Sequence, residues 1–184
     1  GKPIIIYTLE LFDNHTDIDG IVVACIKDWI PFLEKMIKKF EINKVVKIVP
    51  GGKSGQESIY NGLCAAEDFT KSKWLNLSSN LSIADWINNS CISLVLIHDG
   101  VRPLITENTI TDNIAKVKEC GSCITCVPSI ETVVVNQRDG NLSIPKRSDC
   151  LIARAPQSFY LRDILAAHRK SHEENLPDFI DSCS

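Results

Sequence analysis

An acid and a guanidinium group stand together at the point where an apolar segment of the sequence ends. Residues 94–97 read Leu-Val-Leu-Ile, and Asp99, Gly100 and Arg102 follow within the next five positions. Such a segment predicts a strand that is buried on both faces. Since ligands bind outside the carboxyl ends of the strands in open α/β sheets, we expect chemistry at Asp99 and Arg102. The alternative is an Asp–Arg ion pair that only closes a turn, and residue types alone do not decide between the two.

A glycine-rich segment is the second candidate. Residues 50–58 read Pro-Gly-Gly-Lys-Ser-Gly-Gln-Glu-Ser, a predicted turn from a strand into a helix that contains Gly51, Gly52, Lys53 and Ser58. Free backbone N–H groups at a helix start suit an anion or the edge of a nucleotide, and glycine does not obstruct close approach. The spacing matches neither a Walker A loop nor the Rossmann fingerprint. Glycines that serve only the geometry of the turn are the alternative.

Cationic side chains form the third candidate. Lys146 and Arg147 are adjacent in the sequence, and Arg154 follows seven positions after Arg147. Arginine grips phosphate with paired hydrogen bonds, so Arg147, joined by Lys146 or Arg154, is a candidate phosphate contact. A basic face that only meets solvent is the alternative.

The histidines and cysteines give weaker signals. A catalytic triad of Ser58, His98 and Asp99 is not supported by their spacing, so we expect His98 to be structural. Three further histidines are expected at the surface, namely His15, His168 and His172. A C-x2-C-x2-C pattern, Cys120, Cys123 and Cys126, is compatible with a metal site but lacks a fourth ligand. We expect reduced thiols that act as small apolar side chains in the cytoplasm.

Composition limits the classes of protein to consider. The 184 residues suffice for one domain, residues 1–184, and their net charge of −3 gives no general attraction to nucleic acid or to an anionic membrane. No apolar segment approaches the roughly 18–20 residues that span a bilayer, and the first residues do not form a signal peptide. We therefore expect neither nucleic acid nor a membrane among the partners.

The elements that must position these residues alternate along the chain. Apolar segments predict strands at residues 18–26, 45–49, 94–97 and 122–127. Helical periodicity predicts helices at residues 3–12, 27–40, 56–69, 106–120 and 159–172. Short β segments at 132–135, 142–144 and 151–153 predict a β-arm over residues 130–155, and residues 70–90 predict a surface excursion with a short helix around 83–87. The alternation predicts a three-layer α/β/α fold on a mainly parallel sheet.

Short motifs occur in a fixed order along almost the whole chain except residues 70–90. They are Gly1-Lys2-Pro3-Ile4-Ile5, Pro50-Gly51-Gly52 with Gln56-Glu57-Ser58 and Asn61-Gly62-Leu63, His98-Asp99-Gly100-Val101-Arg102-Pro103, Glu131-Thr132, Ala155-Pro156-Gln157-Ser158-Phe159 and Ile180-Asp181-Ser182-Cys183-Ser184. This order resembles the cytidylyltransferases that couple CTP to a polyol phosphate, either 2-C-methyl-D-erythritol 4-phosphate or ribitol 5-phosphate. The resemblance implies a Rossmann-like nucleotidyltransferase sheet from which the β-arm protrudes.

The resemblance also implies roles for the candidates. Gly51, Gly52, Lys53 and Ser58 would bind the cytosine end of CTP. Asp99 and Gly100 would lie near the ribose and the phosphates. Asp99 and Arg102 would be the catalytic residues, and Asp99 a candidate ligand of Mg²⁺. Three residues would hold the polyol phosphate, namely Arg102, Thr132 and Arg147. In the family the β-arm exchanges across a homodimer, which leaves open whose site Arg147 serves.

The implied reaction is an in-line attack of the substrate phosphate on the α-phosphorus of CTP, which releases pyrophosphate. Cations and Mg²⁺ would neutralise the triphosphate. The family's first Gly-rich loop is expected upstream of Gly1, and its last strand and helix beyond Ser184, within a protein of roughly 230 residues that still fits one domain. We accordingly expect little or no activity from these 184 residues alone.

Two positions favour the ribitol branch. Ala155 stands where the erythritol-phosphate enzymes have Thr, and Glu131 stands where Asp is usual. Two other functions stay open at this point. One is a nucleotide-binding relic of the fold without catalysis, and the other is a sugar-phosphate nucleotidyltransferase that uses another base.

Overall fold

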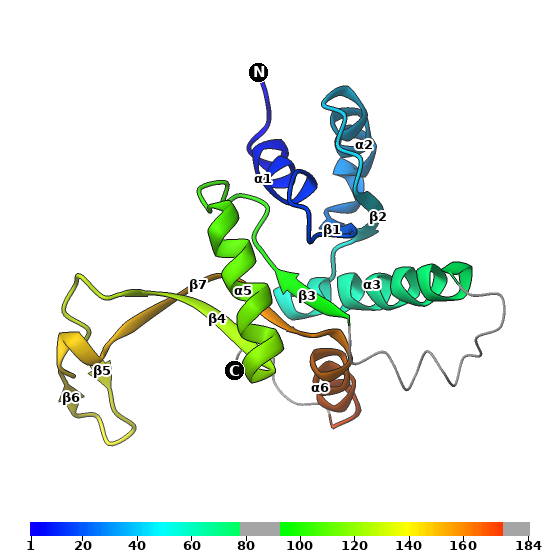
Figure 1. Ribbon diagram of the computed structural model, residues 1–184. Helices are drawn as coiled ribbons and strands as arrows, with labels where there is room; N and C mark the ends of the chain where they lie inside the picture. The colour runs from blue at the N-terminus through cyan, green and yellow to red at the C-terminus, as the bar shows by residue number, and fades with distance from the viewer. Residues whose placement is uncertain (78–92, 175–184) are drawn as a thin grey trace.

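Three small sheets and the helices around them make up residues 1–77 and 93–174, which the computed structural model describes. The first half contains α1 (Ile4–Asp13), β1 (Ile21–Cys25), the 3₁₀ turn η1 (Lys27–Trp29), α2 (Ile30–Lys39), β2 (Val45–Pro50) and α3 (Gly55–Leu77). The second half contains β3 (Leu94–Ile97), α5 (Glu107–Cys120), β4 (Ser122–Pro128), β5 (Val135–Asn136), β6 (Leu142–Ser143), η3 (Arg147–Asp149), β7 (Leu151–Tyr160) and α6 (Leu161–Glu173) (Figure 1).

The strands combine parallel and antiparallel pairs. β1 and β2 are parallel neighbours joined through α2, which is the βαβ unit that the alternating pattern predicts. β7 lies between β3 and β4 and runs antiparallel to both, so β3 and β4 run in the same direction. The predicted α/β class is confirmed, and the antiparallel β7 at the centre of its sheet is an addition that the sequence did not indicate.

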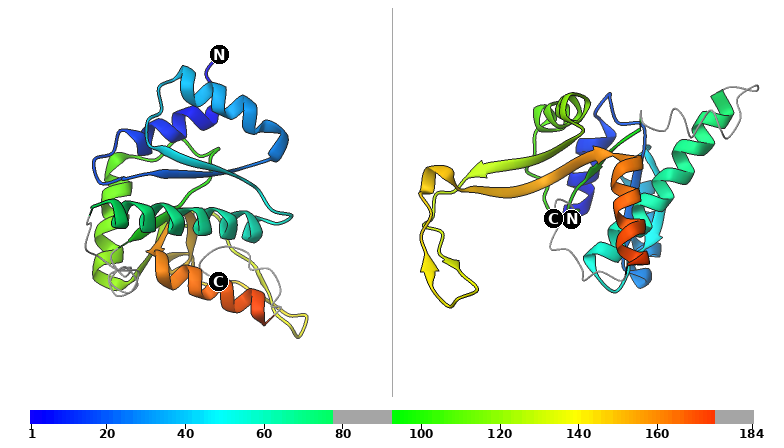
Figure 2. Two further views of the ribbon diagram at one scale, coloured as in Figure 1. Left: turned by 90° about the vertical axis from the view of Figure 1, so that its right-hand side faces the viewer. Right: turned by 90° about the horizontal axis from the view of Figure 1, so that it is seen from below.

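Helices cover both faces of the strand layer. Ile6 and Leu9 of α1 pack with Val23 of β1 and with Leu33 of α2, while α3 lies against β1 and β2 from the other side (Figure 2). Helix α1 also reaches β3, since Phe12 of α1 packs in a cluster with Leu94 and Leu96. The β1–β2 pair and β3 therefore share one layer, although no strand pairing joins them within the described part of the chain.

β3 is packed on both faces, as its apolar sequence predicts. Leu94 and Leu96 belong to the cluster formed by α1 and α5, whereas Val95 and Ile97 belong to the cluster formed by α3 and α6. Alternate residues of a strand point to opposite faces, so these four side chains tie the strand to four helices. The strand therefore has a fixed end, from which residues 98–103 emerge.

The predicted β-arm projects from the body of the molecule. β4 and β7 leave the sheet side by side and lead to the short hairpin of β5 and β6 (Figure 1). Three large apolar side chains on the arm are strongly exposed, namely Ile130 at 82%, Leu142 at 69% and Ile144 at 67%.

Several predicted boundaries were wrong. β7 continues to Tyr160, so the last helix begins at Leu161 rather than at residue 159. α3 extends to Leu77, so the first part of the predicted excursion at 70–90 is helical, and the helix predicted at 83–87 lies outside the described residues. His15 and His168 are buried, at 3% and 5% exposure, although both were expected at the surface. In the described ranges, no helix combines the length and the apolar character that crossing a bilayer requires.

Ile110 provides a test of this packing. Its side chain is fully buried in the cluster that joins α5 to α1 and β3. Replacement Ile110→Ala is expected to lower the free energy of unfolding by about 2–5 kcal/mol, because it leaves a cavity as well as removing apolar contacts. Ile110→Val is the matched control, with an expected cost of about 0.5–1.5 kcal/mol. Urea titration measures both, and equal stability of the two variants would contradict the packing described.

Candidate active site

The loop after β3 is closed by an ion pair. Arg102 Nε donates to Asp99 Oδ2 at 2.5 Å, and the backbone N–H of Arg102 donates to the carbonyl of Asp99 at 3.0 Å. The side chains of Arg102 and Asp99 are 52% and 56% exposed. The Asp–Arg ion pair that the sequence left open as the alternative is therefore present in this structure. Because an exposed pair of this kind contributes only about 0–1 kcal/mol, its partners can exchange it for a ligand at little cost.

His98 belongs to the framework of the same loop. Its Nε2 lies 2.9 Å from the carbonyl oxygen of Arg102, and its ring packs against Phe12 with 5.2 Å between centroids. Burial lowers the pKa of His98, and this effect outweighs the hydrogen bond to Arg102 and the charge of Asp99, which both raise it. A neutral ring with Nε2 protonated satisfies the carbonyl, so His98 supports the loop that carries Asp99 and Arg102.

Gly100 is held against α1. The hydroxyl of Thr8 donates to the carbonyl of Gly100 at 2.9 Å, and the Ile5 side chain lies at contact distance from the position that a Cβ on Gly100 would take. Thr8 is only 3% exposed, so this hydrogen bond is shielded from water. Sequence reasoning missed Thr8, because a threonine within an amphipathic helix carries no signal of the loop that packs against it.

The glycine-rich turn between β2 and α3 is built as a helix cap. Ser54 Oγ accepts from the backbone N–H of Glu57 at 3.2 Å, and Glu57 Oε2 accepts from the N–H of Lys53 at 2.6 Å. Ser54 is thus the N-cap of α3, and Glu57 reaches back to the residue before it, which is a variant of the capping box. The N–H of Gly52 donates to Ser58 Oγ at 2.9 Å, and Ser58 Oγ donates to the carbonyl of Ser54. A Cβ at Gly52 would lie 2.3–2.6 Å from side-chain atoms of Glu57, so only glycine fits there.

This cap changes what the turn can bind. The expectation of free N–H groups at Gly52 and Lys53 is wrong for this structure, because Ser58 and Glu57 already accept from them. Glu57 also places a carboxylate beside the start of α3, where it repels a phosphate. The turn therefore suits the neutral edge of a base better than an anion.

Thr132 and Arg147 meet on the arm. Arg147 Nη2 lies 3.4 Å from Thr132 Oγ1, and both residues are exposed, as are Lys146 and Arg154. Figures 1 and 2 show the arm directed away from the helices and strands that carry the other candidates. The structure thus brings the predicted residues together in three separate groups: the loop after β3, the turn after β2, and the arm.

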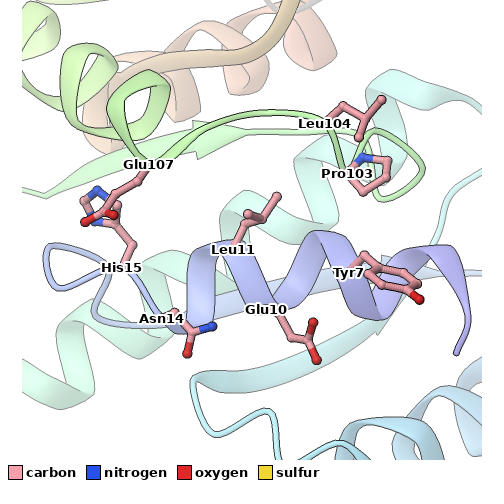
Figure 3. Close-up of a pocket in the computed structure, with 8 residues that line it drawn as sticks. All are labelled: Tyr7, Glu10, Leu11, Asn14, His15, Pro103, Leu104 and Glu107. Atoms are coloured by element: carbon pink, nitrogen blue, oxygen red, sulfur yellow. The ribbon is translucent and has the colours of Figure 1, made fainter.

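A groove of about 390 Å³ lies between α1 and the segment after Arg102 (Figure 3). It is lined by Tyr7, Glu10, Leu11, Asn14, His15, Pro103, Leu104 and Glu107. None of the predicted site residues lines it. Its charged groups are the acids Glu10 and Glu107, which repel a triphosphate, and its His15 is already bonded to Thr111 Oγ1 at 3.0 Å. We do not assign a nucleotide to this groove.

The cysteine pattern does not form a metal site. Within residues 1–77 and 93–174, no group of three or more His, Cys, Asp or Glu side chains could hold a metal ion. Burial raises the pKa of the Cys123 thiol, which keeps it protonated. Six cysteines in these ranges are free thiols, namely Cys25, Cys64, Cys120, Cys123, Cys126 and Cys150.

Solved structures share the fold of this chain. The structure matches, with a TM-score of 0.75 and 22% identity over 100% of this chain and 70% of the other, the 4-diphosphocytidyl-2C-methyl-D-erythritol synthase of Anaerococcus prevotii. It also matches the 2-C-methyl-D-erythritol 4-phosphate cytidylyltransferase of Thermus thermophilus, with a TM-score of 0.68 and 19% identity over 100% of this chain and 72% of the other. At these identities the matches establish the fold, a nucleotidyltransferase fold.

Sequence comparison establishes the family. The family model described as IspD, 2-C-methyl-D-erythritol 4-phosphate cytidylyltransferase, matches residues 81–182. The ribitol-5-phosphate cytidylyltransferase of Vibrio parahaemolyticus is 47% identical over 185 residues, which cover 100% of this chain and 70% of that protein. The 2-C-methyl-D-erythritol 4-phosphate cytidylyltransferase of Clostridium botulinum is 35% identical over 176 residues, which cover 95% of this chain and 67% of that protein. The chain belongs to this family of cytidylyltransferases.

His98 predicts a pH dependence of stability. Because its pKa is lower in the folded than in the unfolded protein, unfolding takes up a proton at low pH. The stability that His98 contributes is fully present above the ordinary histidine pKa of about 6.5 and is lost as the pH falls through the lowered folded value. His98→Asn is expected to flatten the fall in unfolding free energy below that pH. His172→Asn, at an exposed position, is the control, and an unchanged pH profile in His98→Asn would refute the assignment.

Proposed function

We propose that the protein joins CTP and ribitol 5-phosphate to give CDP-ribitol and pyrophosphate. The observation that carries the choice of polyol is the identity of 47% to a ribitol-5-phosphate cytidylyltransferase, against 35% to a methylerythritol-phosphate enzyme. Ala155 and Glu131, which depart from the erythritol-phosphate pattern, support the same choice. The two alternatives from the sequence, a relic without catalysis and an enzyme for another base, are less favoured, because these relatives are named as cytidylyltransferases.

In this proposal the turn after β2 recognises the base of CTP. Ser58 and Glu57 already accept from the N–H groups of Gly52 and Lys53, and Glu57 leaves a carboxylate nearby, so the turn suits the edge of a base better than a phosphate. Ser58 holds the turn in this shape, and glycine at position 52 allows the Glu57 side chain to pack against the turn. The exposed Lys53 side chain completes the contact.

The loop after β3 is proposed to act on the phosphates. Gly100 would approach the ribose and the triphosphate, and Arg102 would neutralise charge on the polyol phosphate. An oxygen of that phosphate attacks the α-phosphorus of CTP, the new P–O bond forms as the bond to the β-phosphate breaks, and pyrophosphate leaves. Positioning and neutralisation by cations are the contributions that such a transfer needs from the protein.

Asp99 fits a divalent cation that is shared with the nucleotide. Mg²⁺ commonly binds through one or two carboxylates and completes its shell with substrate phosphates and water. A single exposed carboxylate such as Asp99 meets that requirement once it exchanges its partner Arg102. The cation would neutralise the triphosphate and the departing pyrophosphate.

The arm is proposed to act between two copies of the chain. Thr132 and Arg147 are 3.4 Å apart at its exposed surface, and the arm points away from its own body (Figure 1). Strongly exposed Ile130, Leu142 and Ile144 on the same arm supply apolar surface for a contact between copies. We therefore propose a single-domain cytoplasmic homodimer in which the arm serves the neighbour's site, with neither nucleic acid nor membrane as partner.

The test is pyrophosphate release by the full-length protein from CTP with each polyol phosphate supplied separately. Ribitol 5-phosphate is expected to give a kcat/KM at least tenfold above that of 2-C-methyl-D-erythritol 4-phosphate, which corresponds to about 1.4 kcal/mol of transition-state discrimination. UTP, ATP and GTP serve as controls for the base, and EDTA followed by Mg²⁺ as the control for the cation. Preference for the methylerythritol substrate would overturn the choice of polyol, and binding of CTP without any turnover would favour the relic.

Replacement Arg102→Ala separates the two roles of that residue. Loss of the exposed ion pair is expected to change the unfolding free energy by less than about 1 kcal/mol. Loss of a charge-assisted contact to phosphate is expected to weaken affinity for the polyol phosphate by on the order of tenfold or more, with the KM for CTP little changed. Lys116→Ala, which removes a similar exposed pair with Glu119, is the matched control. Unchanged affinity in Arg102→Ala would return Arg102 to a turn-closing role.

A further inference from the structure

A chain of buried hydrogen bonds connects α5 to the two long strands of the arm. Ser158 Oγ donates to Asn113 Oδ1 at 2.8 Å, and Asn113 Nδ2 donates to Thr125 Oγ1 at 2.9 Å. Thr125 in turn donates to the carbonyl of Pro156 at 2.8 Å. The second hydrogen of Asn113 Nδ2 goes to the carbonyl of Thr109. Every donor in this chain has an acceptor, so one orientation of each side chain is selected.

Two members of the network are deeply buried, and Thr125 is half-buried. Asn113 is 4% exposed and Ser158 is fully buried. A polar amide at such a position normally costs stability unless all its hydrogen bonds are made, and an apolar residue would serve as well for stability alone. The polar side chain of Asn113 therefore serves a purpose that requires directional hydrogen bonds and that apolar packing does not provide.

The network lies where the pairing of β4 with β7 is irregular. Ile124 pairs with Gln157, but the next pair is Cys126 with Ala153, so the register advances two residues on β4 and four on β7. The extra residues form a bulge in β7, and a bulge bends a strand and changes its direction. Pro156 lies within the bulge and has no N–H to donate to the ladder. Its carbonyl accepts from the hydroxyl of Thr125.

The bulge separates the sheet from the arm. On one side, Ser122–Ile124 and Gln157–Phe159 pair next to β3, and on the other side β4 and β7 lead out to the hairpin of β5 and β6 (Figure 1). Because Thr132 and Arg147 lie beyond this point, a change of angle at the bulge displaces both of them. α5 is packed against β3 through Ile110 and Ile114, so Asn113 fixes the bulge relative to the strand that leads into the loop of Asp99.

We propose that Asn113, with Thr125 and Ser158, fixes the direction in which the arm leaves the sheet and thereby positions Thr132 and Arg147 for the phosphate of the polyol substrate. The second half of this statement rests on the proposed function. Asn113 is a positioning residue in this account, since it acts on the substrate only through the arm. The network selects the angle of the arm, and Arg147 makes the contact.

The decisive variant replaces the network with apolar groups of similar size, as Asn113→Leu, Thr125→Val and Ser158→Ala together. Single replacement of Asn113 leaves the hydroxyls of Ser158 and Thr125 without their partner, and the resulting loss of stability would obscure the result. The triple variant removes these groups together and leaves only the carbonyl of Pro156 without its donor, so it is expected to fold with a modest loss of unfolding free energy. Ile114→Val, on the same helix and outside the network, is the matched control for altered packing of α5.

Two measurements are made on each variant. Hydrogen exchange of the backbone amides of residues 129–150 is expected to quicken in the triple variant, while exchange in α1 and β1 stays as in the parent. The KM for the polyol phosphate is expected to rise by on the order of tenfold, with the KM for CTP unchanged, because a misplaced Arg147 loses its contact.

The outcomes distinguish the two halves of the proposal. Parent-like exchange in the arm of the triple variant would overturn the role of the network altogether. Faster exchange with an unchanged KM for the polyol phosphate would overturn the link to the substrate. Should the parent protein turn over no polyol phosphate, the proposed function fails together with that link, and the exchange measurement still decides whether Asn113 fixes the arm.

Discussion

The packing of β3 on both of its faces is the constraint on which the rest of the structure depends. Leu94 and Leu96 lie in the cluster with α1 and α5, while Val95 and Ile97 lie in the cluster with α3 and α6. A strand held from both sides has no freedom to slide by one residue, because such a slip would exchange its two faces. The loop that begins at His98 therefore starts from a defined point, and its short-range contacts set the positions of Asp99 and Arg102.

The fixed end of β3 also explains why the half-exposed loop after it can be ordered. Thr8 bonds the carbonyl of Gly100, and His98 bonds the carbonyl of Arg102 while packing on Phe12. Both supports come from buried or half-buried groups near α1, whereas Asp99 and Arg102 face solvent. The division leaves the backbone of the loop fixed and its two charged side chains available, since only their weak mutual pair must be exchanged for a ligand.

Much of the fold could be predicted because it follows from the spacing of apolar residues. Double-sided burial of β3, the βαβ unit of β1 and β2, and the cap of α5 at Thr106 all follow from local pattern. β7 could not be predicted at its true length, since Pro156 and the bulge interrupt the alternation that marks a strand. His15 and His168 were misplaced for a similar reason, because burial depends on which helix or loop packs nearby.

The elements that carry the candidate residues could be predicted, but the hydrogen bonds of those residues could not. The glycine turn and the tip of β3 are visible in the sequence as breaks after apolar segments. Which N–H groups stay free depends on side chains that fold back, and Glu57 and Ser58 do so within four and six residues of the groups they accept from. The sequence likewise did not decide whether Asp99 and Arg102 pair with each other, as they do in the structure, or each face a ligand.

The function of the arm could not be predicted, for a different reason. It depends on the direction in which the arm leaves the sheet rather than on the residue types of the arm. Its cationic side chains could be predicted from the sequence, yet Arg147 can serve a phosphate only if β4 and β7 leave the sheet at one angle. A continuous ladder alone would let the sheet twist gradually into the arm. The register is irregular at residues 124–126, where Thr125 is hydrogen-bonded to Asn113 of α5. This irregularity replaces the gradual twist with a localised bend that is fixed relative to α5. The polar core of this bend and the apolar core around β3 meet on one helix, so the loop that carries Asp99 and the base of the arm share a common support.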